Sequence, residues 1–247
     1  MSTAIDEIAV VVPSRNEAAL LPRSLSALEE STRRMTLKFP HVRTSLTVVL
    51  DSSTDTSAEL LARHPQVRVR SVSFGRVGAA RNAGIAAALS AAGVPSSRLW
   101  VATTDADSAV PVDWLEHHYT RALAGVDVLV GTVEPFPAEL DPSRLVQWHA
   151  WHELREGHSH VHGANLGFRA DIFTALGGFP DIGLHEDREF VAIARARGSV
   201  VQATDACRVR TSGRLQGRVE GGFAGFLATL DVPGDRVDPA GTSAAPR

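Results

Sequence analysis

The chain has 247 residues, of which 44% are hydrophobic and 21% charged, and its formal net charge is −3. This is an ordinary globular balance, and it gives no bulk indication of binding to nucleic acid or to an anionic membrane. The single cysteine, Cys207, excludes an internal disulfide and a zinc site built from several cysteines. The single lysine, Lys38, follows no glycine-rich loop, which excludes a Walker-type phosphate loop.

The first half of the chain alternates short apolar runs with helical patterns. The predicted strands are residues 8–12, 46–50, 67–72, 99–104 and 126–130. The predicted helices are residues 16–30, 54–63, 76–92 and 111–123. Strands and helices that alternate at these lengths form βαβ units, so we expect an α/β fold with a mostly parallel sheet flanked by helices.

This alternation breaks after about residue 133, where Pro135 and Pro137 end the regular half. In the remainder, we predict helices over residues 145–156, 171–176, 185–197 and 217–230, and strands over 161–168 and 200–203. Residues 233–247 are rich in Pro, Gly, Ala and Ser, a composition typical of disorder. We therefore expect one domain over residues 1–232, with halves that meet near residue 132, and a disordered tail.

No apolar run approaches the ~20 residues that a membrane-spanning helix needs. The first residues also lack the basic and then apolar pattern of a secretory leader. We therefore expect a cytoplasmic protein without an integral membrane segment, which would visit the membrane only as a peripheral protein.

Asp105-Ala106-Asp107 directly follows a predicted strand. Two carboxylates at this spacing can hold a hard divalent cation such as Mg²⁺ or Mn²⁺, commonly together with substrate phosphates. Most Asp-x-Asp sequences are ordinary turns, but polar clusters also follow two other predicted strands, at residues 13–17 and 51–55. Because ligands bind at the carboxyl ends of parallel strands, we expect the three clusters to converge on one site.

Several residues of these loops and of the following helices have two interpretations. Arg15 and Glu17 could contact a nucleotide, or Glu17 could simply favour a helix N-terminus. Asp51 could accept an N–H group of a nucleobase, or it could start a turn. Arg81 could reach a base or a diphosphate, or it could be a surface arginine. Asp187, in His185-Glu186-Asp187, could be a general base or a helix-capping carboxylate.

Basic residues and histidines also cluster in the second half of the chain. Arg208, Arg210, Arg214 and Arg218 could clamp a diphosphate or an acidic acceptor, or they could form a solvated basic segment. His158, His160 and His162 alternate, so on a strand they would share one face. We do not favour a metal site there, because three histidines at adjacent positions on one face of a strand rarely converge on one ion.

Taken in order, the motifs resemble those of family 2 glycosyltransferases, which have the GT-A fold. The matching stretches are residues 10–17, 51–55, 78–84, 105–107, 163–169, 177–179 and 185–187. The resemblance spans roughly residues 7 to 198 and depends on the ordered set rather than on any single motif. It implies a donor half up to about residue 132 and an elaborated acceptor half after it.

The resemblance implies an inverting transfer from a nucleotide-diphosphate sugar, a UDP-sugar being the first guess, with Mg²⁺ or Mn²⁺ as cofactor. Asp107 with Asp105 would bind the metal, and Asp187 would be the catalytic base. The implied donor-binding residues are Pro13, Arg15, Glu17, Asp51, Arg81, Asp105 and Asp107.

The acceptor would be a small molecule or a lipid-linked molecule. Family members build this side of the site after the sheet, where Trp148, Trp151, His149 and His152 lie. One of the two tryptophans is expected to be in the core. The candidate acceptor-side residues are Trp148, Trp151, His162, Asn165, Glu186, Arg210 and Arg214.

The chain departs from the family pattern at the second strand end, where Leu50 and Ser52 replace a common acidic residue and a common glycine. It also lacks the Gln-x-x-Arg-Trp sequence of processive synthases, so we expect a single sugar addition. One alternative is a sugar-phosphate nucleotidyltransferase, which normally needs a glycine-rich first loop and a lysine. Another is a non-catalytic nucleotide-sugar-binding module, for which loss of Asp107 or Asp187 would be expected.

Overall fold

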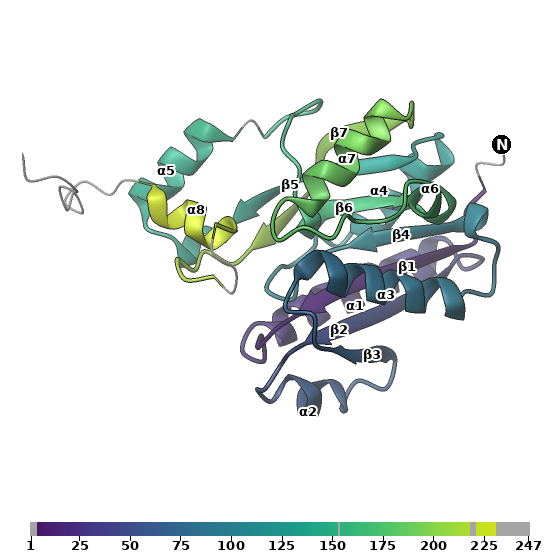
Figure 1. Cartoon of the computed structure of the whole chain (residues 1–247), viewed down its shortest axis with the longest axis horizontal. Coiled ribbons are helices and arrows are strands. Elements are labelled where there is room, and N and C mark those ends of the chain that lie inside the picture. The colour runs from purple at the N-terminus through teal and green to yellow at the C-terminus, as the bar shows by residue number, and fades with distance from the viewer. Residues whose placement is uncertain (1–3, 153, 218–220, 231–247) are drawn as a thin grey trace, which may run out of the picture.

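A seven-stranded sheet forms the centre of the computed structural model, which describes residues 4–152, 154–217 and 221–230 (Figure 1). The strand order is β3-β2-β1-β4-β6-β5-β7. The strands are β1 (Glu7–Ser14), β2 (Arg43–Asp51), β3 (Val67–Val72), β4 (Leu99–Thr103), β5 (Val128–Pro135), β6 (Leu166–Arg169) and β7 (Val201–Thr211). Only β6 runs antiparallel to its neighbours among these strands, so the predicted mostly parallel α/β fold is confirmed.

Helices cover both faces of this sheet. The helices of the described residues are α1 (Leu21–Lys38), α2 (Ser57–Leu61), α3 (Val77–Ala91), α4 (Trp114–Leu123), α5 (Pro142–Trp151), α6 (Ala170–Ala175), α7 (Glu186–Ala196) and α8 (Phe223–Thr229). Short 3-10 turns lie at η1 (Ser96–Arg98), η2 (Pro137–Glu139) and η3 (Gly163–Asn165). Apolar residues of α1 and α4 pack on one face, and those of α3, α6 and α7 pack on the other.

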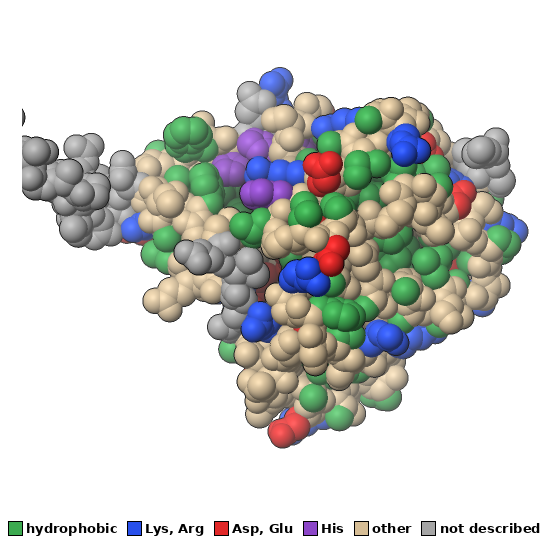
Figure 2. Space-filling view, in the orientation of Figure 1, with side chains coloured by type: hydrophobic (Ala, Val, Ile, Leu, Met, Phe, Trp, Pro, Cys, Tyr) green, Lys and Arg blue, Asp and Glu red, His purple; other side chains and the backbone are tan. Residues whose placement is uncertain are grey.

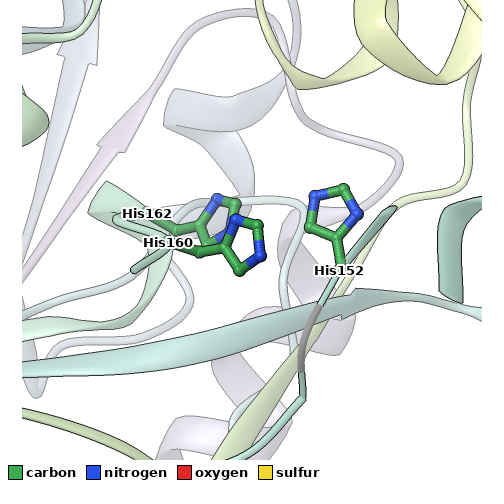
Figure 3. Close-up of side chains that lie close together, drawn as sticks. All are labelled: His152, His160 and His162. Atoms are coloured by element: carbon green, nitrogen blue, oxygen red, sulfur yellow. The ribbon is translucent and has the colours of Figure 1, made fainter. Parts of the chain in front are cut away.

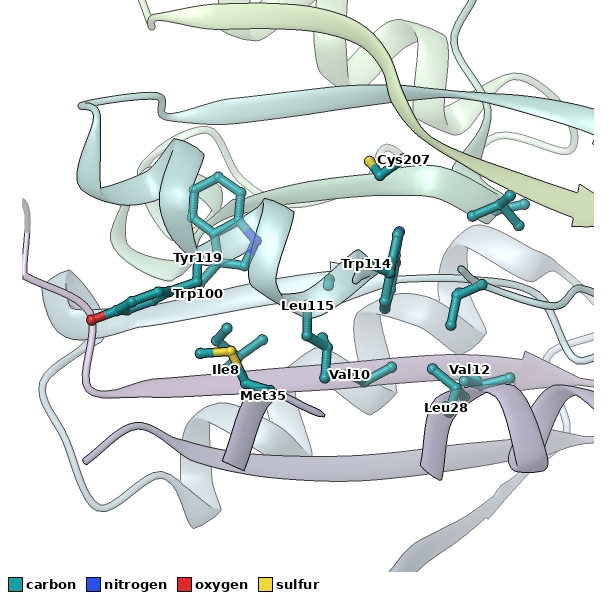
Figure 4. Close-up of a cluster of buried hydrophobic side chains, with 14 of the residues drawn as sticks. Ile8, Val10, Val12, Leu28, Met35, Trp100, Trp114, Leu115, Tyr119 and Cys207 are labelled. Carbon is teal, nitrogen blue, oxygen red and sulfur yellow. The ribbon is translucent and has the colours of Figure 1, made fainter. Parts of the chain in front are cut away.

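The predicted strands are continuous apolar runs because both faces of the sheet are buried, as β1 shows. Its side chains alternate between the two cores, as expected for a strand buried on both faces. Ile8, Val10 and Val12 join the core under α1 and α4 (Figure 4), whereas Ala9 and Val11 join the core under α3.

Beyond the sheet, α5 and α8 lie together at the far ends of β5 and β7 (Figure 1). A small apolar cluster of Leu140, Trp148, Leu227 and Leu230 holds them to each other. The Arg144 guanidinium donates hydrogen bonds to the carbonyl oxygens of Leu227, Ala228 and Leu230, at 3.1, 3.1 and 2.6 Å. These contacts satisfy carbonyl groups that the end of a helix otherwise leaves without partners.

Several predicted boundaries were wrong. The first helix begins at Leu21 rather than residue 16, because Asn16 has a positive φ of 54° that no α-helix accommodates. The strand expected over 161–168 is the turn η3 followed by β6, and the strand expected over 200–203 extends to Thr211. The helices expected over 145–156 and 217–230 are the shorter α5 and α8.

The predicted tail over 233–247 and Arg218 lie outside the described residues. Within the described ranges, none of the helices has the length and apolar character needed to cross a bilayer.

Candidate active site

A cavity of about 630 Å³ opens at the carboxyl ends of β1, β2 and β4 and extends toward α5 and α8. We call it the central pocket. All predicted donor-side residues line it, namely Pro13, Arg15, Glu17, Asp51, Arg81, Asp105 and Asp107. Asp187 lines it as well, together with Trp151, His162, Glu186 and Arg214 from the predicted acceptor side. The expected convergence of the three strand ends is therefore present.

Arg81 lies at the floor of the pocket and is only 3% exposed, so it is not a surface arginine. Its guanidinium donates to Asp105 Oδ1 at 2.6 Å and also pairs with Glu186 at the start of α7. Gly163 makes room for it, because a Cβ at that position would lie 2.5 Å from Arg81 Cζ. Arg81 thus ties α3, the Asp105 loop and α7 together.

Arg214 pairs with two acidic residues of the donor side, although the sequence placed it on the acceptor side. Its guanidinium nitrogens lie 2.7 Å from both carboxylate oxygens of Glu17 and 2.9 Å from Asp107 Oδ2. A planar guanidinium is suited to such a two-oxygen contact. Arg214 therefore places positive charge beside Glu17 and Asp107 in the pocket.

The Asp107 carboxyl group is held by hydroxyl groups on its other side. Ser108 Oγ and Thr211 Oγ1 donate to Asp107 Oδ1 at 3.2 and 3.3 Å. Burial raises the pKa of Asp107 to about 6, and the nearby negative charge of Asp105 adds to this effect. The carboxylate pair Asp105–Asp107 offers the oxygen ligands that Mg²⁺ and Mn²⁺ prefer, so the residues fit such an ion.

Asp51 organises the loop that leads into α3. Its Oδ1 accepts the backbone N–H groups of Phe74 and Gly75 at 2.7 and 2.9 Å, and its Oδ2 accepts that of Arg76 at 3.1 Å. Among the described residues Oδ2 accepts only this bond, so it is the oxygen that retains capacity to accept a further N–H group. Asp51 thus has a structural role in this loop and faces the pocket as well.

Asp187 lies in the first turn of α7, after His185 has turned the chain with a left-handed φ of 65°. Its Oδ2 accepts the Gly163 N–H at 2.6 Å, and its Oδ1 accepts the Arg188 N–H at 2.8 Å. These bonds fix the carboxylate in orientation. The preceding Glu186 has a different environment, because its burial raises its pKa while Arg81 opposes the shift.

Three predicted acceptor-side residues do not line the pocket. Trp148 is fully buried between α5 and α8, while Trp151 is 71% exposed, so one of the pair is indeed a core residue. Asn165 is also fully buried, where it accepts from Trp114 Nε1 and donates to the carbonyl oxygens of Thr132 and Cys207. Arg210 projects outward on β7, with an exposed side chain 3.9 Å from Glu134.

The pocket also contains residues that are not among the candidate donor-side, catalytic and acceptor-side residues. Arg188 follows Asp187 directly, and a search for charged neighbours of the proposed base would have found it. His152 and His160 lie beside His162. Burial lowers the pKa of His152, and it lowers that of His162 to about 3. Phe223 and Phe226 of α8 complete the wall, and no local sequence pattern signals this.

Comparisons with known proteins agree with the fold and the motifs. The sequence matches the family described as Glycosyl transferase family 2 over residues 9–177. A search of curated protein sequences finds no significant match.

Solved structures with the same fold include several glycosyltransferases. S. aureus TarS 1-349, solved with UDP-GlcNAc, has a TM-score of 0.64 at 16% identity, over 92% of this chain and 62% of that one. GalNAc-T7, solved with UDP, GalNAc and Mn²⁺, has a TM-score of 0.61 at 14% identity, over 87% and 46%. The mannosyltransferase PcManGT from Pyrobaculum calidifontis, solved with GDP-Man and Mn²⁺, has a TM-score of 0.56 at 21% identity, over 85% and 58%.

The chain thus spans about three fifths of the TarS fragment and less than half of GalNAc-T7. At these identities the likeness concerns the fold, whereas the family match covers most of the chain. The sequence match and the ordered strand-end motifs lead to the same conclusion: the chain belongs to glycosyl transferase family 2 and has the GT-A fold.

Proposed function

We propose that the protein transfers a sugar from a nucleoside-diphosphate sugar to an acceptor hydroxyl group with inversion at the anomeric carbon. The observation that carries this proposal is the convergence of Asp51, Asp105, Asp107 and Asp187 on one pocket from three separate segments. The structural neighbours solved with UDP-GlcNAc or GDP-Man support a nucleotide-sugar donor. A UDP-sugar is our first choice, since the carboxylate of Asp51 can accept the imide N–H of uracil.

On the donor side, the residues act by binding and orienting. Asp105 and Asp107 would hold a Mg²⁺ or Mn²⁺ ion, which when bound offsets the charge of the leaving diphosphate. Neighbours solved with Mn²⁺ support such an ion. Arg214 adds a fixed positive charge beside Asp107, and Glu17 holds that guanidinium in place.

On the acceptor side, Asp187 would remove the proton of the attacking hydroxyl group. A general base must carry a free lone pair in the pocket, and each oxygen of Asp187 accepts one backbone N–H group and has capacity for more. The acceptor, a small molecule or a lipid-linked one, would enter past the exposed Trp151. Its hydroxyl oxygen would then attack opposite the leaving diphosphate, which gives inversion.

Calorimetric titration with UDP, GDP, dTDP and ADP, each with and without Mn²⁺, tests the donor site. We expect one diphosphate to bind with an affinity that Mn²⁺ increases at least tenfold, and Asp107→Asn to abolish that increase. Folded protein that binds none of the four would contradict the proposal.

The Asp187→Asn variant tests the base separately. It should reduce transfer by at least a thousandfold while donor affinity changes less than threefold, because the base acts on the acceptor. A parallel loss of donor affinity would show that Asp187 has a structural role instead.

A further inference from the structure

Three histidines form a compact cluster in the part of the central pocket that faces α5 and α8 (Figure 3). His152, His160 and His162 each offer a ring nitrogen, and the three nitrogens all lie within 4.8 Å of one another. Figure 2 shows histidine side chains gathered at one place on this face of the molecule. We propose that this cluster binds one divalent transition-metal ion, of which Zn²⁺ is the first choice, at a site separate from Asp105 and Asp107.

The reason for doubting a histidine site from sequence does not hold for this arrangement. Residues 158–162 do not form a strand, and the cluster is not made of the three alternating histidines. His158 does not belong to this cluster of ring nitrogens, and its Nε2 lies 3.2 Å from the carbonyl oxygen of Thr204. The third ligand comes instead from His152, which ends α5.

The position of His152 is fixed by its neighbours in the way that metal ligands commonly are. Its Nδ1 lies 3.0 Å from the carbonyl oxygen of Trp148, and a carbonyl can only accept, so Nδ1 carries the hydrogen. The ring also stacks on the buried Trp148 ring at a centroid distance of 4.1 Å and an angle of 6°. A second-shell bond of this kind leaves Nε2 with its lone pair available for a metal.

The second observation concerns His162. Its Nε2 is buried and has no hydrogen-bond partner among the described residues. A buried polar atom without a partner is unfavourable by about 1–3 kcal/mol, and a bound ion would satisfy it. A buried nitrogen of this kind beside two other imidazoles is the arrangement expected of a metal site.

The geometry requires only a small closure of the rings. Zn–N bonds of about 2.1 Å in a tetrahedral site place the nitrogens about 3.4 Å apart, so no pair of nitrogens would have to close by more than about 1.4 Å. Side-chain torsions can supply this, since the rings of His160 and His162 lie side by side at a centroid distance of 6.2 Å. Imidazole ligands favour zinc and its neighbours over Mg²⁺ or Ca²⁺, which distinguishes this site from the carboxylate pair.

The charges around the cluster also bear on the proposal. Arg188 contributes positive charge that disfavours a cation at His152 and His162. The carboxylate of Asp187 opposes it, because its Oδ2 accepts the N–H of Gly163, the residue that follows His162. Three protein ligands would leave a fourth position open, as in catalytic rather than structural zinc sites. If the proposed function is correct, an acceptor oxygen would fill that position beside Asp187.

Direct metal titration tests the site without any turnover. The chain, freed of any histidine tag, should bind one equivalent of Zn²⁺ and one of Co²⁺, and the Co²⁺ form should show the intense visible absorption of a low-coordinate nitrogen site. His160→Gln and His152→Gln should each weaken binding at least tenfold. His64→Ala is the matched control, since His64 lies in the turn between α2 and β3, and it should bind as the unchanged chain does.

The carboxylate site is distinguished by Asp105→Asn and Asp107→Asn, which should keep the Co²⁺ spectrum while losing the metal-dependent nucleotide binding. The histidine variants should lose the Co²⁺ spectrum while keeping the metal-dependent nucleotide binding. Absence of stoichiometric Zn²⁺ binding would overturn the proposal, as would unchanged binding in folded histidine variants. Because nucleotide titration reads only the donor site, failure of the proposed function and failure of the histidine site are separate results.

Discussion

Arg214 shows how much of this site depends on one residue. Its guanidinium lies 2.9 Å from Asp107 Oδ2, the position at which a divalent cation would also bind. Two positive charges at that distance repel each other, and burial weakens the screening by water. Arg214 and a metal ion therefore compete for Asp107 unless the diphosphate of the donor draws the guanidinium toward itself.

We therefore expect Arg214→Ala to tighten the binding of Mn²⁺ alone, by at least fivefold, and to weaken the binding of the nucleoside diphosphate. Titration of free Mn²⁺ followed by electron paramagnetic resonance measures the first effect. Arg210→Ala is the matched control, because Arg210 belongs to the same strand region but projects away from the pocket. Weaker Mn²⁺ binding in Arg214→Ala would show that the guanidinium organises the ion site rather than competing for it.

His118 of α4 is a residue whose protonation opposes folding. It is fully buried and accepts a hydrogen bond from Trp100 Nε1 at 3.1 Å, and burial lowers its pKa to about 3. The unfolded chain, with a histidine pKa of about 6.5, therefore binds a proton at a pH where the folded chain does not. Its stabilising contribution is complete above pH 6.5 and is lost as the pH falls from there toward 3.

Between pH 7 and pH 5, this linkage should remove about 2 kcal/mol from the free energy of unfolding. Urea unfolding at both pH values measures this loss of stability. The His118→Gln variant keeps an acceptor for Trp100, and its free energy of unfolding should not show the part of the loss that comes from His118. An equal loss in both proteins would assign the pH dependence to other groups.

At the scale of elements, the packing of α3 against the sheet depends on one glycine. A Cβ at Gly84 would lie 2.5 Å from Val11 Cγ1 and 2.7 Å from Val49 Cγ2, on the two central strands. Such distances require the helix to move outward. Because Arg81 is on the same helix, that movement would also displace its guanidinium from Asp105 and Glu186.

The Gly84→Ala variant should therefore lose about 1–3 kcal/mol of stability. It should also bind the nucleotide more weakly. Gly225→Ala in α8 is the matched control, since nothing lies within 4 Å of an added Cβ there and alanine is the better helix former. Chemical unfolding should show that Gly84→Ala lowers the free energy of unfolding and that Gly225→Ala raises it. An unchanged free energy of unfolding in Gly84→Ala would mean that α3 can shift freely on the sheet.

The elements also show which features could be predicted. Strands buried on both faces, such as β1, are continuous apolar runs, so the parallel sheet and the meeting of Asp51, Asp105 and Asp107 at its edge follow from the pattern. β7 is different, because its first three residues are only partly buried and its buried residues alternate only from Cys207 to Thr211, and the prediction stopped at residue 203. Its register with β5 contains a bulge between Gly131 and Val133 that no pattern specifies. The contact of Arg214 with Glu17 could therefore not be foreseen, since 197 residues separate them.

At the scale of the whole molecule, the two sides of the pocket are built from different parts of the fold. The donor side is built on the sheet, where Glu17 is bonded to the half-buried Arg214 and Asp107 to the buried Thr211. The opposite side is built on α5 and α8, which a small apolar cluster and the bonds of Arg144 hold together. A unit with so few buried apolar contacts has a lower local stability than the sheet. We therefore expect the two sides of the pocket to open with different free energies.

The Arg144→Ala variant tests this division. Loss of a buried, charged donor that serves three carbonyl groups should lower the local stability of α8 by about 2–3 kcal/mol, because those carbonyls lose their partners. Hydrogen exchange should then accelerate about thirtyfold or more in α8, while exchange in β1 and β4 stays unchanged, and nucleotide binding should persist. Arg195→Ala, at an exposed position of α7, should change neither region. Equal acceleration across the sheet would instead mean that α5 and α8 unfold only with the rest of the chain, so that the two walls of the pocket form one cooperative unit.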